Sequence, residues 1–197
     1  MKNHLDQRPT KDSNDIYLVG ELIGSPLQLS TNIYKHTIAV PRNYNEARFD
    51  IIPITIHKKL LDSVKYKKII VSGNIATRQL SDVSAAKKTS LYIKAISLGD
   101  GEDTDISNSV YITGKIVSGP EFRMTPKGCF ISELSVKVNN TLIFCIAWGE
   151  TAKNMNIFNV GDYVEISGEL QSREYIKNYK SIITYEICIH DIHKIDG

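Results

Sequence analysis

The sequence predicts an all-β protein made of two tandem five-stranded barrels, each with a short helix between its third and fourth strands. Apolar and polar residues alternate over short stretches, as they do in half-buried strands. Glycines stand inside several of these stretches, where a small closed barrel needs bends. The motifs of the first half return in the second half at a nearly constant spacing, which indicates an internal duplication.

The composition limits the classes of protein to which the chain can belong. Its 197 residues allow one large domain or two small ones, and 42% hydrophobic residues suffice for a core. No apolar run approaches the roughly 20 residues of a membrane span, and the first dozen residues lack the apolar segment of a signal peptide. We therefore expect a cytoplasmic protein. The three cysteines have no C-x-x-C spacing, so neither a metal site nor a disulfide framework is predicted.

The repeat and the charge pattern set the expected domain boundaries. Gly20 and Pro26 return 94 residues later as Gly114 and Pro120, and the stretch 71–78 returns 95 residues later as 166–173. Residues 99–107 hold four acids and no base, which is typical of a short self-repelling linker. We expect a flexible tail over 1–12, a divergent basic barrel over 13–98, the acidic linker over 99–107 and a second barrel over 108–197.

The second half carries the clearer strand pattern. Leu134, Val136 and Val138 alternate with polar residues, and Asn139–Asn140 forms a turn into the next strand. A helix between the third and fourth strands of an otherwise all-β domain is the plan of the OB-fold. The remaining elements are expected to be a strand over 141–148, a short helix over 151–158, a strand over 163–170 and a closing strand over 182–192.

The first half fits the same plan less closely. Its opening strand is expected to stop at Pro26, as the matching strand downstream stops at Pro120. Pro53 lies inside the third strand and cannot donate a ladder hydrogen bond, which predicts an edge strand or a bulge. The helix is expected over 58–64 and the closing strand over 91–98.

Aromatic and basic residues in the second half predict a surface that binds single-stranded nucleic acid. Such binding needs flat side chains on which bases stack and cations that follow the phosphates. Trp148 shares one strand face with Phe144, and alternation alone leaves open whether that face is core or platform. Arg173 and Tyr175 share a face in a polar stretch, which indicates a stacking surface, while a tyrosine that covers the barrel end stays open as the alternative. The other candidates are Arg123, Lys127, Lys137 and Lys177 in the second half, and Tyr34, Arg42 and Arg78 in the first.

The net charge of +2 hides an asymmetry between the two halves. Residues 13–98 carry a net charge of +6, whereas residues 108–197 carry −1. A basic half suggests an anionic partner, although a solvated lysine surface has the same composition. We expect the first barrel to supply charge and the second to supply aromatics, with Ile56 at the position that matches Trp148.

Signals of catalysis are weak. The chain has no phosphate-cradling glycine loop and no H-E-x-x-H motif, and its five histidines are scattered. No Ser/His or Cys/His constellation with a supporting acid is visible. We therefore predict no catalytic residues, no metal and no cofactor.

The motifs of residues 108–195 resemble those of bacterial single-stranded DNA-binding proteins, and the whole chain is similar to their two-domain members in Firmicutes. The resemblance rests on Pro120–Gly128 (PEFRMTPKG), Trp148–Gly149, Val160–Val164 and Gly168–Tyr175. It implies an OB-fold in which Trp148 and Tyr175 stack on bases and Phe144 faces DNA. The turn at 139–140 is shorter than the family's loop, and the sequence ends without the family's acidic, Pro-Phe-ending tail.

The expected function is sequence-independent binding of single-stranded DNA in replication, recombination or repair, in a bacterial, nucleoid-associated protein. The resemblance implies four barrels per assembly, hence a homodimer, and replication-protein partners are expected to depend on the tail that is missing here. Two alternatives stay open at this point: a protein–protein scaffold of a replication or mobile-element complex that binds DNA weakly, and an RNA-binding protein.

Overall fold

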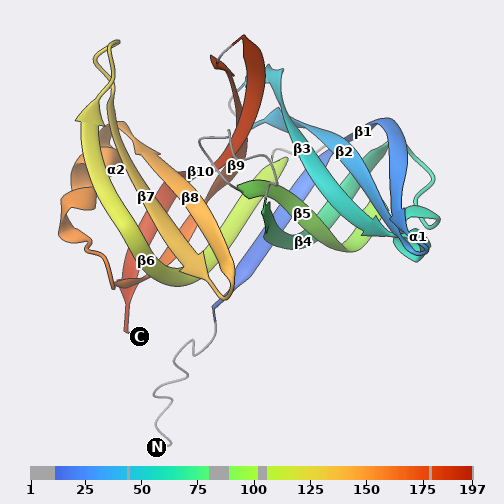
Figure 1. Ribbon diagram of the computed structural model, residues 1–197, viewed down its shortest axis with the longest axis horizontal. Helices are drawn as coiled ribbons and strands as arrows, with labels where there is room; N and C mark the ends of the chain where they lie inside the picture. The colour runs from blue at the N-terminus through green and yellow to red at the C-terminus, as the bar shows by residue number, and fades with distance from the viewer. Residues whose placement is uncertain (1–11, 44, 80–88, 102–105, 178, 197) are drawn as a thin grey trace, which may run out of the picture.

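The computed structural model describes residues 12–43, 45–79, 89–101, 106–177 and 179–196 (Figure 1). Its ten strands form one continuous sheet that closes into two barrels lying side by side. The predicted all-β architecture is therefore confirmed. Most of the predicted tail and part of the predicted linker lie outside the described residues. No helix in the described part of the chain is long and apolar enough to cross a membrane.

Both barrels have the same strand order. In the first, β1 pairs with β2 and β4, β2 with β3, and β3 with β5, which closes the ring against β4; the second repeats this order with β6 to β10. The pairs β3–β5 and β8–β10 are parallel and the rest are antiparallel, as the OB plan requires. The first barrel consists of β1 (Asn14–Ser30), β2 (Ile33–Arg42), β3 (Asn45–His57), α1 (Lys58–Leu61), β4 (Lys68–Gln79) and β5 (Thr89–Asp100). The second consists of β6 (Asn108–Met124), β7 (Phe130–Val138), β8 (Thr141–Trp148), α2 (Gly149–Lys153), the 3₁₀ helix η1 (Asn154–Ile157), β9 (Tyr163–Lys177) and β10 (Lys180–Ile195).

The Gly–Pro steps bend the first strand of each barrel but do not end it. The prediction that these strands stop at Pro26 and Pro120 was wrong, because β1 and β6 both run past the prolines. Instead, the β1–β2 ladder shifts register near Gly24 and the β6–β7 ladder shifts near Gly119. Gly24 and Gly119 have φ values of 74° and 79°, a backbone region in which glycine is unstrained. The result is a bulge that lets each strand continue into a projecting hairpin.

Pro53 lies on a strand that has a neighbouring strand on each side, so the predicted edge strand or bulge was also wrong. β3 pairs with β2 on one side and with β5 on the other, and Pro53 lies opposite Thr37 without a register shift. The parallel ladder between β3 and β5 is only two residues long, Ile54 and Thr55. Proline is tolerated beside such a short ladder because few hydrogen bonds on that side need a donor.

Four mid-strand glycines occupy the places where neighbouring backbones approach most closely. A Cβ on Gly168 would lie 2.1 Å from the carbonyl oxygen of Cys188, far inside van der Waals contact. Gly20, Gly73 and Gly114 show the same feature, at 2.3 to 2.5 Å from the carbonyl oxygens of Ala39, Lys94 and Lys137. These glycines allow the strong strand bending that closes a five-stranded barrel.

An antiparallel ladder between β1 and β6 joins the two barrels. It pairs residues 14–18 with residues 108–112 and is centred on Ile16 opposite Val110. These two residues are themselves 94 apart, which is the spacing of the sequence repeat. The ladder is therefore symmetric about its own centre, like an interface between two identical subunits related by a twofold axis. The contacts of β9 with β3 and of β4 with β8 follow the same symmetry.

A buried ion pair fixes β9 of the second barrel to the first barrel. The fully buried carboxylate of Asp50 accepts hydrogen bonds from Arg42 at 2.9 and 3.1 Å. It also accepts from the backbone N–H and the hydroxyl of Ser172, at 2.8 and 3.0 Å. Arg42 donates in turn to the carbonyl oxygen of Ser172 at 3.1 Å. We call these three residues the inter-barrel clamp.

Replacing Gly168 by alanine is expected to lower the free energy of unfolding by about 2 kcal/mol, because the added Cβ meets a backbone oxygen that cannot move independently. Urea unfolding followed by circular dichroism measures this. Gly99→Ala is the matched control, since a Cβ on Gly99 would have nothing within 4 Å. Equal midpoints for the two variants would show that the close approach at Gly168 does not constrain the barrel.

Candidate nucleic-acid interface

The structure settles which face of β8 is core. Ile143, Cys145 and Ala147 belong to the hydrophobic core. Because side chains alternate along a strand, Phe144 and Trp148 lie on the opposite, outer face of the second barrel. Trp148 ends the strand with 37% of its surface exposed, and Phe144 is half-buried. The bulkier face of this strand is therefore a surface rather than part of the barrel core.

Part of this outer face is covered in the two-barrel arrangement. Ile146 lies between Phe144 and Trp148 on the same face of β8, yet only 1% of it is exposed. On the neighbouring strand β7, Ile131 pairs with Trp148 and is equally buried. β4 of the first barrel contacts β8. The exposed ring of Trp148 thus stands at the border of a covered region.

β9 supplies the second pair of candidate residues. Val164, Ile166 and Leu170 face the core, so Arg173 and Tyr175 lie on the outer side of this strand. The Arg173 guanidinium is exposed and lies 3.9 Å from the carboxylate of Glu186. Tyr175 pairs with Ile182 and Lys177 pairs with Lys180 across the hairpin, but the side chains of Tyr175 and Lys177 lie outside the described part of the structure.

The remaining cations of the second barrel differ in their environment. Arg123 on β6 forms an exposed ion pair with Glu133 at 3.0 Å, which offsets its charge. Lys127 lies in the tip of the β6–β7 hairpin, and Lys137 is exposed on β7. The β6–β7 and β9–β10 hairpins rise from the same side of the second barrel (Figure 1). The outer face therefore has aromatic rings and cations, but acidic residues stand beside two of the arginines.

The candidate residues of the first barrel are distributed over three places. Tyr34 is half-buried and falls on the side of β2 that also carries buried Ile38 and Val40. Arg42 belongs to the inter-barrel clamp. Arg78 is exposed on the outer side of β4 and lines a groove between the barrels.

The first-barrel position that matches Trp148 is His57 rather than Ile56. His57 and Trp148 each end the third strand of their barrel and precede its helix at the N-cap. Ile56 is fully buried in the core. The predicted match with Ile56 is off by one residue, because the turns before the third strands differ in length. A shift of one residue exchanges the two faces of a strand.

The groove between the barrels has residues that sequence patterns did not select. Its volume is ≈ 580 Å³. Both Tyr92 of β5 and Tyr185 of β10 line it. Tyr92 could have been found from the sequence, since it lies between core residues Leu91 and Ile93 on a strand and must face outward. The other lining residues are Leu29, Lys35, Thr37, Ile51, Pro53, Thr55, Arg78, Ser90 and Ile183. We call this the inter-barrel groove.

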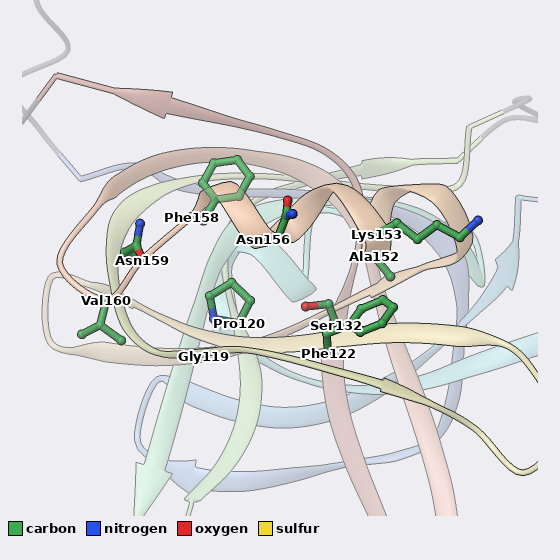
Figure 2. A pocket seen from close by; sticks show the side chains of 10 residues that line it. All are labelled: Gly119, Pro120, Phe122, Ser132, Ala152, Lys153, Asn156, Phe158, Asn159 and Val160. Atoms are coloured by element: carbon green, nitrogen blue, oxygen red, sulfur yellow. The ribbon is translucent and has the colours of Figure 1, made fainter.

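A second cavity, of ≈ 590 Å³, lies between the α2–η1 segment and the strands β6 and β7 (Figure 2). Pro120, Phe122, Phe158 and Val160 give it an apolar lining, and the Ser132 hydroxyl in its wall is buried with no hydrogen-bond partner. The Phe122 ring stacks on Phe130 at a centroid distance of 5.6 Å. By strand alternation Ser132 faces away from the side that carries Trp148, so this cavity is separate from the outer face.

Two cysteines of the second barrel have unreactive thiols. Burial raises the pKa of Cys145 above its usual range and that of Cys188 to about 11, so both thiols stay protonated at neutral pH. No group of three or more potential metal ligands occurs in the described part of the chain. What the arrangement supplies is a surface of rings, hydroxyls and cations, which suits binding.

The second barrel is similar to known proteins. Residues 107–195 match the Single-strand binding protein family. The single-stranded DNA-binding protein 1 of Staphylococcus aureus is 30% identical over 80 residues, which cover 34% of this chain and 48% of the relative. The single-stranded DNA-binding protein of Deinococcus radiodurans is 25% identical over 129 residues, 52% of this chain and 43% of the relative. The chain spans about half the length of these curated relatives.

The two-barrel fold is also found in a solved structure. The wild-type single-stranded DNA binding protein from Thermus aquaticus superimposes with a TM-score of 0.75 over 95% of both chains, at 18% identity. A deletion mutant of the same protein gives 0.72. The likeness at this identity concerns the fold, and it includes both barrels. The sequence likeness to the single-strand binding protein family covers the second barrel, residues 107–195.

Proposed function

We propose that this protein binds single-stranded DNA without reading its sequence, on the outer face of the second barrel. The observation that carries the proposal is the position of Trp148 and Phe144 on the outside of β8, opposite the core residues of the same strand. The relatives matched by sequence are named single-stranded DNA-binding proteins, which supports DNA as the ligand.

The chemistry of the face supports stacking more than base-edge recognition. Every base offers a flat surface to an aromatic ring, and each stacked base contributes about 1–3 kcal/mol whatever its identity. Arg173, Lys137 and Lys127 supply cations for the phosphates around these rings. Binding of this kind releases counterions, so it weakens steeply as salt rises.

The proposal also includes the cellular process and the oligomeric state. A protein that coats exposed single strands serves replication, recombination or repair in the bacterial cytoplasm, at the nucleoid. The β1–β6 ladder already joins two barrels within one chain. A homodimer would bring four barrels together, and sedimentation velocity measures that state directly.

A protein–protein scaffold is the second candidate, and one observation favours it. The cavity of Figure 2 is bordered by the exposed apolar side chains of Phe122 and Val160, and Ile157 on η1 is exposed as well. Exposed apolar groups around a cavity are typical of protein contacts. Under this alternative the outer face of β8 would contribute little to DNA affinity.

Replacing Trp148 by alanine is expected to weaken binding to a thymidine oligonucleotide at least tenfold, since the loss of one stacked base corresponds to about 1.4 kcal/mol or more. Fluorescence anisotropy of a labelled oligonucleotide measures the affinity. The melting temperature is expected to stay nearly unchanged, because the ring lies outside the core.

Ile157→Ala is the matched control, because it removes an exposed apolar side chain beside the cavity and leaves the outer face intact. If Ile157→Ala weakened binding as much as Trp148→Ala, or if neither the native protein nor its variants bound the oligonucleotide at low salt, the proposed surface would be wrong. An oligouridylate run in parallel separates DNA from RNA preference.

Replacing Arg173 by glutamine is expected to weaken binding at low salt and to make the plot of log affinity against log salt less steep by about 0.7, the value for one phosphate contact on a single strand. The comparison is Lys153→Gln, which removes a charge that already pairs with Glu150 on α2. An unchanged slope for Arg173→Gln would exclude a phosphate contact for this arginine.

A further inference from the structure

We propose that the cavity between β6, β7 and the α2–η1 segment binds an extended, uncharged peptide segment of a partner protein. The segment pairs with the open edge of β6 and inserts a tyrosine side chain between Pro120 and Ala152 (Figure 2). This activity goes beyond the proposed function, because the peptide site lies apart from the outer face and leaves DNA binding there unchanged.

The edge of β6 beside the cavity has no neighbouring strand along residues 117–124. β9 pairs with this edge only as far as Lys115. The loop before β9 extends the pairing by one residue, since Ile116 exchanges backbone hydrogen bonds with Gly161 and Asp162, each at 2.9 Å. Beyond that point, the described residues pair with β6 only on its β7 side. An open edge presents a row of backbone donors and acceptors, with which an extended peptide can pair.

The β6–β7 hairpin next to this edge has one apolar face. Pro120, Phe122 and Met124 alternate with charged residues along β6, and 54% of Phe122 and 61% of Met124 are exposed. Phe122 lies opposite Ser132 of β7, and both line the cavity, so the apolar face of the strand is the one on the cavity side. These side chains continue the cavity lining towards the hairpin tip. Their two-residue period matches an extended segment with an apolar residue at every second position.

A polar group in the cavity wall lacks a partner. The Ser132 hydroxyl is fully buried and makes no hydrogen bond to any described residue (Figure 2). A buried hydroxyl without a partner destabilises the free protein, and a ligand group that reaches it removes this cost. The cross-strand neighbour Phe122 is more than half exposed, so its ring can rotate aside as the ligand enters. Tyrosine suits the site because its ring is apolar and its hydroxyl both donates and accepts.

The charges at the cavity favour an uncharged peptide over nucleic acid. Its described lining includes one cation, Lys153, and no carboxylate. Lys153 already pairs with Glu150 at 2.5 Å and lies 4.9 Å from the centre of the Phe130 ring. A phosphate backbone would need further cations. The side-chain amides of Asn156 and Asn159, by contrast, offer donors and acceptors that suit peptide groups.

The cavity has the size of a ligand site and does not overlap the outer face. Its ≈ 590 Å³ lies within the range of about 300–1,000 Å³ that is usual for ligand sites. Ser132 faces the cavity from one side of β7, whereas Ile131 lies on the other side, opposite Trp148. A bound peptide and a DNA strand on the outer face are therefore expected not to compete.

The probe is the capped peptide acetyl-Val-Thr-Tyr-Thr-Val-amide, which presents Val, Tyr and Val on one face when it is extended. It is titrated into the native protein while amide chemical shifts are followed by NMR. We expect shifts at residues 117–124 and 152–160, with slower amide exchange along the open edge of β6. The same peptide with phenylalanine in place of tyrosine is expected to bind about fivefold more weakly, the loss that one hydrogen bond typically gives.

Three variants test the named contacts. Ser132→Ala is expected to bind the tyrosine and phenylalanine peptides equally and to keep its melting temperature, because the hydroxyl has no partner in the free protein. Val160→Asp is expected to weaken both peptides at least tenfold, since the ligand would desolvate a carboxylate at the rim. Ile176→Asp is the matched control, because it places the same charge at another exposed apolar position, outside the cavity.

The peptide site would be overturned if the cavity residues of the native protein did not shift at millimolar peptide. It would also be overturned if Val160→Asp and Ile176→Asp bound the peptide equally. Shifts of the same residues with a thymidine oligonucleotide, or with protein concentration alone, would assign the cavity to DNA or to a second copy of the chain instead. Oligonucleotide affinity measured on the same samples tests the proposed function separately.

Discussion

The antiparallel ladder between β1 and β6 is the constraint on which the arrangement of this protein depends. It pairs equivalent strands of the two barrels about a centre at Ile16 and Val110, so one approximate twofold axis relates everything attached to them. The same symmetry brings β9 onto β3 and β4 onto β8. A strand from the last hairpin of each barrel therefore contacts the other barrel. The outer faces of the two barrels therefore partly cover one another.

The outer faces of the two barrels differ in their side chains. The second barrel has Trp148 and Phe144 on its outer strand, with acidic residues beside its arginines. The first barrel has His57 at the place of Trp148, but its face is basic and receives Tyr185 from its neighbour. The clamp at Asp50 fixes that neighbour, because breaking a buried ion pair leaves an uncompensated charge and costs about 3–5 kcal/mol. Divergence of the two copies thus leaves rings and cations on both faces.

Local patterns predicted the barrels well because strand alternation, mid-strand glycines and the repeat all record the same backbone path. Pro26, Pro53 and Pro120 were misjudged, since the effect of a proline depends on which side of a strand carries a ladder, and that is a tertiary property. The contacts of Asp50 with Ser172, 122 residues apart, have no local signal at all. For the site, alternation located Trp148 on one of two faces, and only the packed core decided between them.

Trp148, the single tryptophan of the chain, reports directly on whether the outer face of the second barrel holds single-stranded DNA, as we propose. The decisive measurement is its fluorescence during titration with a thymidine oligonucleotide at low and at high salt. We expect strong quenching at low salt, because stacking places a base on the ring, and less quenching as salt rises, because added salt reduces the gain from counterion release. Unchanged fluorescence while the oligonucleotide demonstrably binds would contradict the assignment of this face.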